Sequence, residues 1–167
     1  MIIRKSEGKD IDKMMEIYAL ARDFMAKTGN PNQWGPTNWP PRQLITGDIA
    51  EGKSYVCEEE GTVTGTFYFD CGKDIEPTYR NIEDGQWADE SPYGVIHRMA
   101  ADGTVKGTGA AIIDWALSRC PHMRIDTHGD NIVMQKLLEK KGFERRGTIY
   151  VVEDNYPRFA YEKIQED

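Results

Sequence analysis

The clearest chemical signal in this sequence is a glycine-rich segment at residues 103–109. It reads Gly-Thr-Val-Lys-Gly-Thr-Gly and lies between a predicted strand and a predicted helix. Glycine lets the backbone turn tightly and approach a ligand closely. The first turn of the helix offers free N–H groups at the positive end of the helix dipole. We therefore expect this loop to hold a pyrophosphate group, with Lys106 adding a positive charge.

Two familiar nucleotide-binding loops do not fit this segment. The GxxxxGK[ST] pattern of the P-loop NTPases is absent from it. The dinucleotide-binding fingerprint needs a third glycine and follows an early strand, whereas here that glycine is missing and the strand lies in the middle of the chain. A glycine-rich turn that binds nothing fits the same residues about equally well.

Histidine titrates close to neutral pH, and the chain has three histidines. His97 lies in a predicted strand just before the glycine-rich loop and is the favoured general base, with a packed histidine as an equal alternative. His128 is the second catalytic candidate, although a capping or surface role suits it better. His122 follows a proline and is expected to be exposed. Their spacing matches no metal-binding pattern such as HExxH, so we expect no metal.

The whole chain constrains the possible partners. Its 167 residues predict a single domain over residues 1–167, and 39% hydrophobic residues argue against disorder. A net charge of -7 disfavours nucleic-acid binding and suits a cationic partner. The apolar runs are too short to span a membrane, and the polar start is not a signal peptide, so we expect a cytoplasmic protein. The three widely spaced cysteines, which indicate reduced thiols, are Cys57, Cys71 and Cys120.

Hydrophobic periodicity and turn residues predict the elements that position these groups. The predicted strands cover residues 2–4, 55–57, 62–69, 93–100, 123–127, 148–152 and 158–163. The predicted helices cover residues 10–27, 42–51, 110–119 and 131–141. Residues 71–92 form an acidic loop with a possible helical turn, and Asp154-Asn155 joins the last two strands. Hairpins mixed with strand-helix-strand units predict an α+β fold around a mixed sheet.

A resemblance to a known family covers residues 93–144. Residues 95–100 and 106–110 resemble the central motif of the GNAT superfamily of N-acetyltransferases, which is a strand, an [RQ]xxGx[GA] loop and a helix. Residues 124–131 and 134–143 resemble the next strand and the helix that ends in "KxGF". The resemblance implies the GNAT acyl-CoA N-acyltransferase fold, with a mixed central β-sheet flanked by helices. It also implies acetyl-CoA as the co-substrate.

The resemblance further implies which residues bind acetyl-CoA. The main chain near the end of the central strand would donate to the oxyanion, and an asparagine would lie near the pantetheine arm. The implied cofactor-binding residues are Met99, Ala100, Ala101, Lys106, Gly107, Thr108, Gly109, Ala110 and Asn131. His97 resembles a catalytic histidine of some arylalkylamine acetyltransferases. Strand alternation would place His97 and Met99 on one face of the sheet and Ile96 and Arg98 on the other.

Two positions depart from the family pattern. Thr104 stands where the family usually has Arg or Gln. Leu138 stands where members often have a tyrosine that protonates the departing thiolate. The usual general acid is therefore absent or comes from elsewhere. Tyr150 is a candidate replacement, although a tyrosine in a strand is more often a packing residue.

The acceptor site is expected near Trp34 and Trp39, which precede a helix that helps to wall this site in the family. Asp126 and Thr127 are further candidates for binding the substrate or orienting His97. The acidic loop would attract a cation or simply be solvated. These features favour direct acetyl transfer to a primary amine of a small molecule in a ternary complex. The alternatives are a protein or peptide N-acetyltransferase, or a noncatalytic acyl-CoA-binding module; a homodimer is possible.

Overall fold

The computed structural model describes residues 1–151 and 156–166. Within these residues, seven strands form one sheet in the order β1-β2-β3-β4-β5-β7-β6. Neighbouring strands are antiparallel except β4 and β5, which run parallel. The strands are β1 Ile2–Lys5, β2 Ser54–Glu59, β3 Thr62–Gly72, β4 Tyr93–Ala101, β5 His122–His128, β6 Glu144–Tyr150 and β7 Pro157–Ile164.

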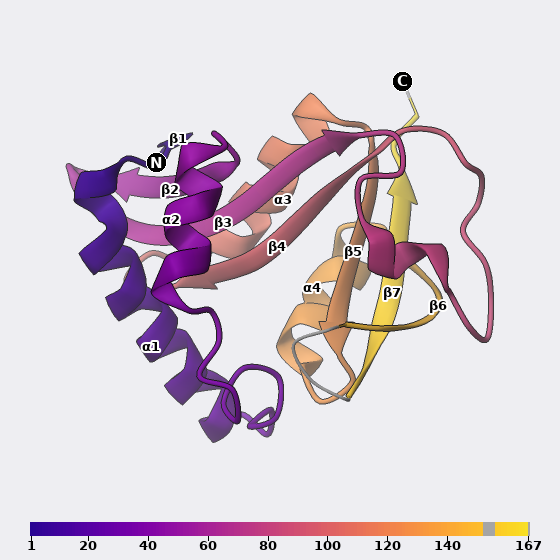
Figure 1. Cartoon of the computed structure of the whole chain (residues 1–167), viewed down its shortest axis with the longest axis horizontal. Helices are drawn as coiled ribbons and strands as arrows, with labels where there is room; N and C mark the ends of the chain where they lie inside the picture. Colours follow the sequence, from indigo (N-terminus) through magenta and orange to yellow (C-terminus); the bar gives the residue numbers. More distant parts are fainter. Residues whose placement is uncertain (152–155, 167) are drawn as a thin grey trace.

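Helices cover both faces of the sheet. In the described part of the chain they are α1 Ile11–Lys27, α2 Arg42–Ala50, α3 Thr108–Arg119 and α4 Ile132–Lys140, with short 3-10 helices η1 Gly8–Asp10 and η2 Pro77–Arg80. Figure 1 shows α1 and α2 in front of the sheet and α3 and α4 behind it. On the same side of the sheet as α1 and α2, but at its opposite end, η2 lies in front of β5 and β7. The predicted α+β fold with a mixed sheet between helices is confirmed.

Each layer has its own apolar cluster. Ile112 and Ile113 of α3 and Leu138 of α4 are fully buried in the cluster behind the sheet. In front, α1 buries Met14, Ile17, Tyr18 and Ala21 at helical spacing, as its apolar stripe predicts. A third cluster lies under η2, where Tyr79 packs with residues of β4, β6 and β7. The strands are therefore held from both sides.

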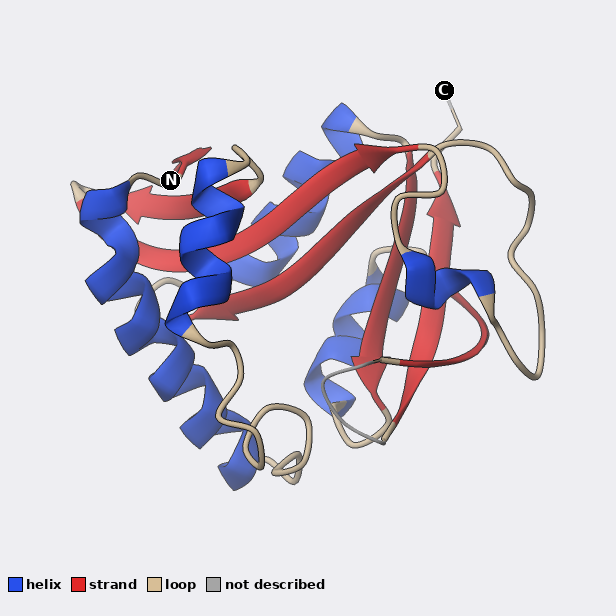
Figure 2. Ribbon diagram, in the orientation of Figure 1, coloured by secondary structure: helices blue, strands red, loops and turns tan. Residues whose placement is uncertain are grey.

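The sheet opens between β4 and β5. Among the described residues these strands pair only at Gly94 with Met123 and at Val95 with Arg124, and beyond that point they diverge (Figure 2). The backbone of β4 also bulges just after His97. Tyr68 pairs with His97 and Thr66 with Ala100, so that one residue of β3 faces two of β4.

This bulge corrects the expected alternation of side chains in β4. Arg98 has a φ of 53°, outside the strand region. Ile96 and Met99 both pack in the cluster behind the sheet. The side chains of His97 and Arg98 both contact Tyr68. The prediction that His97 shares a face with Met99 was therefore wrong, because a bulge inserts a residue and shifts the alternation by one.

Most element boundaries agree with the predicted ones to within two residues. The main exception is β6, which starts at Glu144, four residues before the predicted position. Its first residues, Glu-Arg-Arg, are polar and therefore gave no strand signal in the sequence. Arg145 nevertheless packs on Phe159 of β7, with its guanidinium carbon 3.5 Å from the ring centre. The predicted turn at Asp154-Asn155 lies outside the described residues. No helix of residues 1–151 and 156–166 is both long and apolar enough to cross a membrane.

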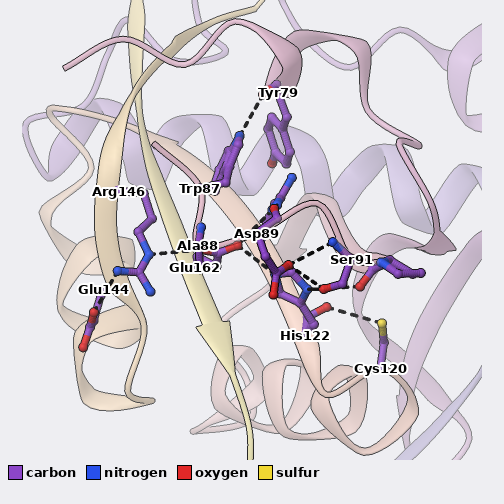
Figure 3. Close-up of polar contacts among 12 residues, drawn as sticks. Tyr79, Trp87, Ala88, Asp89, Ser91, Cys120, His122, Glu144, Arg146 and Glu162 are labelled. Carbon is purple, nitrogen blue, oxygen red and sulfur yellow. Dashed lines mark hydrogen bonds and ion pairs between the residues drawn. The ribbon is translucent and has the colours of Figure 1, made fainter. Parts of the chain in front are cut away.

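A buried carboxylate fixes the long loop before β4. Glu162 of β7 accepts hydrogen bonds from His122 at 2.7 Å and from Arg146 Nε at 3.0 Å (Figure 3). It accepts another from Arg124 Nε at 3.0 Å. It also accepts the Ala88 N–H at 2.8 Å, and Arg124 donates to the Asp89 carbonyl. The loop is thus tied to the sheet by charged hydrogen bonds.

We expect Glu162→Gln to lower the free energy of unfolding by about 3–5 kcal/mol, because it removes one partner of a buried ionic network. Burial alone would raise the pKa of Glu162, but the bonds from His122, Ala88 and Arg124 outweigh it and lower the pKa to about 2. The folded pKa lies below the ordinary value, so this stability is present above about pH 4.5 and is lost as pH falls toward 2.

Urea titrations from pH 7 to pH 3 measure this contribution. The difference in stability between the native protein and Glu162→Gln should shrink as the pH falls. Exposed Glu139 of α4 provides the control, since Glu139→Gln should change stability by less than about 0.5 kcal/mol. A constant difference across the pH range would contradict a charge-based role for Glu162.

Candidate functional site

A cleft lies where β4 and β5 diverge, and its two sides differ in character. On the side of α3 and α4 it is lined by Ile96, Met99, Ile125 and Met134. On the opposite side, beneath η2 and the loop after α1, the lining includes the charged residues Glu76, His97, Arg98, Asp126 and Arg158. The cleft therefore has an apolar half and a charged half that meet between the two strands.

His97 lies between two carboxylates in the charged half. Its Nε2 atom is 3.0 Å from Glu76 Oε2, and its Nδ1 atom is 4.0 Å from Asp126 Oδ2. The His97 side chain is 19% exposed, so it is reachable from the cleft while its environment is mostly protein. The ring centres of Tyr68 and Tyr79 lie 5.6 and 6.2 Å from that of His97. The packing holds the imidazole between the carboxylates.

The two carboxylates are themselves oriented by the loop before β4. The Glu76 N–H donates to the Tyr93 hydroxyl at 3.1 Å, and the Tyr79 hydroxyl donates to Asp126 at 2.7 Å. Burial raises the pKa of Glu76, but the hydrogen bond and charge of His97 outweigh it and lower the pKa to about 2. Burial and the neighbouring Asp126 raise the pKa of Tyr79 well above its ordinary value. Glu76 therefore stays charged and Tyr79 stays a donor.

The start of α3 has the backbone geometry of an anion site. Gly107 caps the helix with a φ of 79°, and the first helical bond runs from the Ala111 N–H to the Gly107 carbonyl. The N–H groups of the first helical turn, which begins at Thr108, have no acceptor within the helix. Lys106 is exposed beside them. These residues fit a pyrophosphate at the end of the helix that borders the apolar half.

Glycine matters at two positions here for different reasons. At Gly107 a Cβ atom would meet open space, but the left-handed backbone disfavours any other residue. At Gly109 a Cβ atom would lie 2.9 Å from a methyl carbon of Leu137. Gly109 therefore lets α3 approach α4 closely, which was not foreseen, while Gly107 shapes the loop itself. The Thr108 hydroxyl ties this turn by donating to the Val105 carbonyl at 3.0 Å.

The other predicted cofactor residues occupy distinct places. Met99 lines the cleft, whereas Ala100 is buried in the cluster under α1 and Ala101 ends β4. Ala110 lies in the first turn of α3. Asn131 caps α4, where its Oδ1 accepts the Met134 N–H at 3.1 Å. Asn131 lines the cleft as well.

Thr127 is a lining residue of the cleft and carries a buried polar atom. The residue is 1% exposed and lines the cleft. In the described part of the chain its hydroxyl has no hydrogen-bond partner. A buried hydroxyl usually has a partner, so this one is suited to a polar group of a bound ligand.

The loop after α1 closes one end of the cleft. Trp34 and Trp39 both line the cleft, and Trp34 is buried with its edge against Tyr18. Gln33 accepts a hydrogen bond from Asn131 at 2.9 Å and so connects this loop to the start of α4. The aromatic wall predicted from the sequence is thus part of the cleft.

Two catalytic candidates lie away from His97. His128 is buried outside the cleft, and its Nδ1 accepts the Asp130 N–H at 2.9 Å in a turn before α4. Tyr150 is 51% exposed and lines a separate hollow with Pro77 and Glu83. The structure therefore does not bring either residue together with His97. Leu138, at the usual tyrosine position, is fully buried in the core.

Sequence reasoning missed several groups in the charged half. Glu76 was grouped with the acidic loop, and Tyr79, Gln33 and Arg158 were not singled out. Glu76 and Tyr79 reach His97 from a loop 18–21 residues earlier in the chain, a contact without a local signature. The Pro77 that starts η2 was the available signal, since proline often opens a helical turn.

Comparisons with solved structures find the same architecture. A GNAT-family acetyltransferase from Streptococcus agalactiae 2603 is 31% identical, with 99% of this chain and 96% of that chain covered and a TM-score of 0.87. One from Listeria monocytogenes 4b F2365 is 16% identical over 97% and 93%, with a TM-score of 0.70. An agmatine N-acetyltransferase is 12% identical over 96% and 97%, with a TM-score of 0.61. Comparisons with family models and with curated proteins find no match.

We expect Gly107→Val to weaken acetyl-CoA binding by at least roughly tenfold, or about 1.4 kcal/mol. A β-branched residue is strongly disfavoured at a φ of 79°, so the loop would have to change its path. Titration calorimetry with acetyl-CoA measures the effect.

Gly61 provides a matched control, because it has a φ of 80° and open space around it but lies in the turn between β2 and β3. Gly61→Val should cost similar stability and leave acetyl-CoA affinity unchanged. If Gly107→Val and Gly61→Val bound acetyl-CoA with equal affinity, the prediction that residues 103–109 bind its phosphates would be wrong.

Proposed function

Because the chain belongs to the GNAT family of acetyltransferases, we propose that it transfers the acetyl group of acetyl-CoA to a primary amine of a small molecule. The observation that supports this most directly is the position of His97 between Glu76 and Asp126 in the cleft between β4 and β5. A proton acceptor there would face both halves of the cleft. The amine would attack directly in a ternary complex.

The apolar half suits the cofactor arm, and the start of α3 suits its pyrophosphate. Met99, Met134 and Ile125 offer an apolar passage beside β4, and Thr127, whose buried hydroxyl has no partner among the described residues, also lines the cleft. Exposed Lys106 and the N–H groups from Thr108 would meet the phosphates. Acetyl-CoA supplies the acetyl group and a thiolate that can leave.

The charged half suits the acceptor. A primary amine is mostly an ammonium ion at neutral pH, so it would be attracted to the Asp126 carboxylate, which lies 4.0 Å from His97 Nδ1. His97 would take one proton from the ammonium, directly or through one water, to give the neutral amine that attacks. Glu76 would hold the imidazole in place through its 3.0 Å bond to Nε2.

The remaining steps follow from the same geometry. The amine nitrogen would form a bond to the acetyl carbon as the carbon–sulfur bond breaks, and it would lose its extra proton to solvent to give the amide. The main chain near Met99 would donate to the carbonyl oxygen in the transition state. Leu138 cannot donate a proton to the thiolate. A free thiol ordinarily titrates near pH 8.5, so the thiolate can leave unprotonated and take its proton from solvent.

A small acceptor is favoured over a protein or peptide. Gln33 and Asn131 join the loop after α1 to α4, and Arg158 donates to the Gln33 carbonyl at 3.5 Å. This link closes part of the cleft, and an enclosed site suits a small acceptor better than an extended peptide. Trp34 and Trp39 would pack against the apolar part of the amine. The agmatine acetyltransferase shares only the fold at 12% identity, so it does not identify the acceptor.

A noncatalytic acyl-CoA-binding protein is the second candidate. The buried Leu138 favours it, because the residue removes the usual general acid. The arrangement of Glu76, His97 and Asp126 favours an enzyme, since a binding module needs no imidazole held between carboxylates.

A thiol-release assay with acetyl-CoA tests the proposed function. Compounds with an aliphatic primary amine should release free CoA at least roughly tenfold faster than the alcohols or carboxylic acids of the same carbon skeleton. A preference for an anionic acceptor would contradict the role given to Asp126. Tight acetyl-CoA binding without turnover on any amine would instead support the noncatalytic alternative.

We expect His97→Gln to lower kcat by roughly ten- to ten-thousandfold, the range of general acid–base catalysis. Its acetyl-CoA affinity should stay nearly unchanged, because His97 lies in the charged half. The acid limb of the rate–pH profile should shift or disappear, since histidine protonation at low pH removes the base. Steady-state kinetics from pH 5 to pH 9 measure both effects.

Tyr150→Phe serves as the matched comparison, because Tyr150 lies in the separate hollow. Its kcat should remain within about twofold of the native protein if no proton passes through it. A normal acid limb in His97→Gln would show that another group accepts the proton.

A further inference from the structure

A buried tyrosine on α1 is bonded to the backbone of β4 at the bulge. Tyr18 is 1% exposed, and its hydroxyl donates to the Arg98 carbonyl at 2.9 Å. The Trp34 ring meets the Tyr18 ring edge-on with 5.8 Å between centres, which fixes the tyrosine from the side. Burial raises the pKa of Tyr18, so the hydroxyl keeps its proton at any pH at which the protein works.

This bond fixes the orientation of one peptide plane. The Arg98 carbonyl and the Met99 N–H belong to the same planar trans peptide unit and point in opposite directions. Tyr18 holds the carbonyl toward α1, in front of the sheet. The Met99 N–H is therefore turned toward the other face, where the Met99 side chain also packs. That face borders the apolar half of the cleft.

A bulge needs such a restraint more than a regular strand does. Phe67 faces both Arg98 and Met99, and Arg98 has a φ of 53°. His97 and Ala100 each pair with a residue of β3. The peptide between Arg98 and Met99 lies between these pairs and is therefore held less firmly by the hydrogen bonds of the sheet. Beyond Val95, β5 also no longer pairs with β4 among the described residues. The Tyr18 hydroxyl thus contacts β4 where strand pairing restrains it least.

We propose that Tyr18 is a positioning residue, which holds the Arg98–Met99 peptide so that the Met99 N–H donates to the carbonyl oxygen of the bound thioester. This inference rests on the proposed function, because it takes the thioester to lie in the apolar half. Tyr18 touches neither substrate and acts only through the peptide. A donor held in place before the reaction stabilises developing charge without reorganisation.

The charge around this peptide agrees with the same role. Arg98 forms an ion pair with Asp48 of α2 at 2.9 Å, and its guanidinium carbon lies 4.6 Å from the Tyr68 ring centre. The side chain is thus held in front of the sheet together with the carbonyl. The carbonyl of Arg98 is thus held by α1 and its side chain by α2. The N–H of Met99 is left on the side of the cleft.

Tyr18→Phe removes only the hydroxyl and tests the proposal. Infrared difference spectra of bound acetyl-CoA, with and without ¹³C in the thioester carbonyl, report the hydrogen bond to that oxygen. In the native protein the bound carbonyl stretch should lie below that of free acetyl-CoA. In Tyr18→Phe it should move back toward the free value, and kcat should fall by about ten- to a hundredfold, less than the roughly hundred- to thousandfold loss of a whole oxyanion donor.

Tyr161→Phe is the matched control. Tyr161 of β7 is 2% exposed, and its hydroxyl makes no hydrogen bond within the described residues. The control should keep the native carbonyl frequency and kcat. A merely structural role for Tyr18 would lower thermal stability but leave the carbonyl frequency of Tyr18→Phe native, and that result would overturn the proposal.

A second measurement uses the native protein alone and does not depend on a variant that folds. The chain has seven methionines, so ¹⁵N-methionine labelling gives a short list of amide signals. The Met99 amide proton should move downfield with acetyl-CoA but not with S-ethyl-CoA, which lacks the carbonyl. Equal shifts with both ligands would overturn the role of Met99 and hence that of Tyr18. Absence of acetyl-CoA binding would instead refute the proposed function.

Discussion

The separation of β4 and β5 is the constraint on which the rest of this structure depends. Two parallel strands in the middle of a sheet would normally satisfy each other along their whole length, but among the described residues these two pair at only two positions. Beyond them, the facing edges of both strands must be covered by something other than a strand. Helices behind, and loops in front, provide that cover without filling the space completely. The cleft is what remains.

Long-range polar contacts make this open arrangement stable. Glu162 ties the loop before β4 to the sheet through charged hydrogen bonds, and the same loop carries Glu76 and Tyr79 to His97. The network lies on β5, β6 and β7, away from the start of α3. The strands β5, β6 and β7 therefore hold the charged half in place. The start of α3 is held separately, by the close contact of α3 with α4 at Gly109.

The sequence was sufficient for the parts of the fold that have local or periodic signals. The stripe of α1 and the turn at residues 103–109 were both recognisable, and so was the order of strands and helices. The bulge at Arg98 could not be predicted, because it depends on a register shift between β3 and β4. No single residue in the sequence indicates such a shift. The partners of His97 were missed for a similar reason. Glu76 approaches it through a loop whose path is fixed by Glu162, more than eighty residues away.

The loop after α1, which Gln33 joins to Asn131, belongs to the half of the cleft that can change most easily during evolution. The charged half is enclosed mainly by the connections after α1 and before β4, whereas the apolar half is built from strands and helices that also form the core. Loops accept substitutions and insertions more readily than packed elements do. With the acceptor bound in the charged half, as proposed, changes in the two connections would alter which acceptor is admitted while the other half keeps its shape. One scaffold can in this way give rise to enzymes that share a donor and differ in their acceptors.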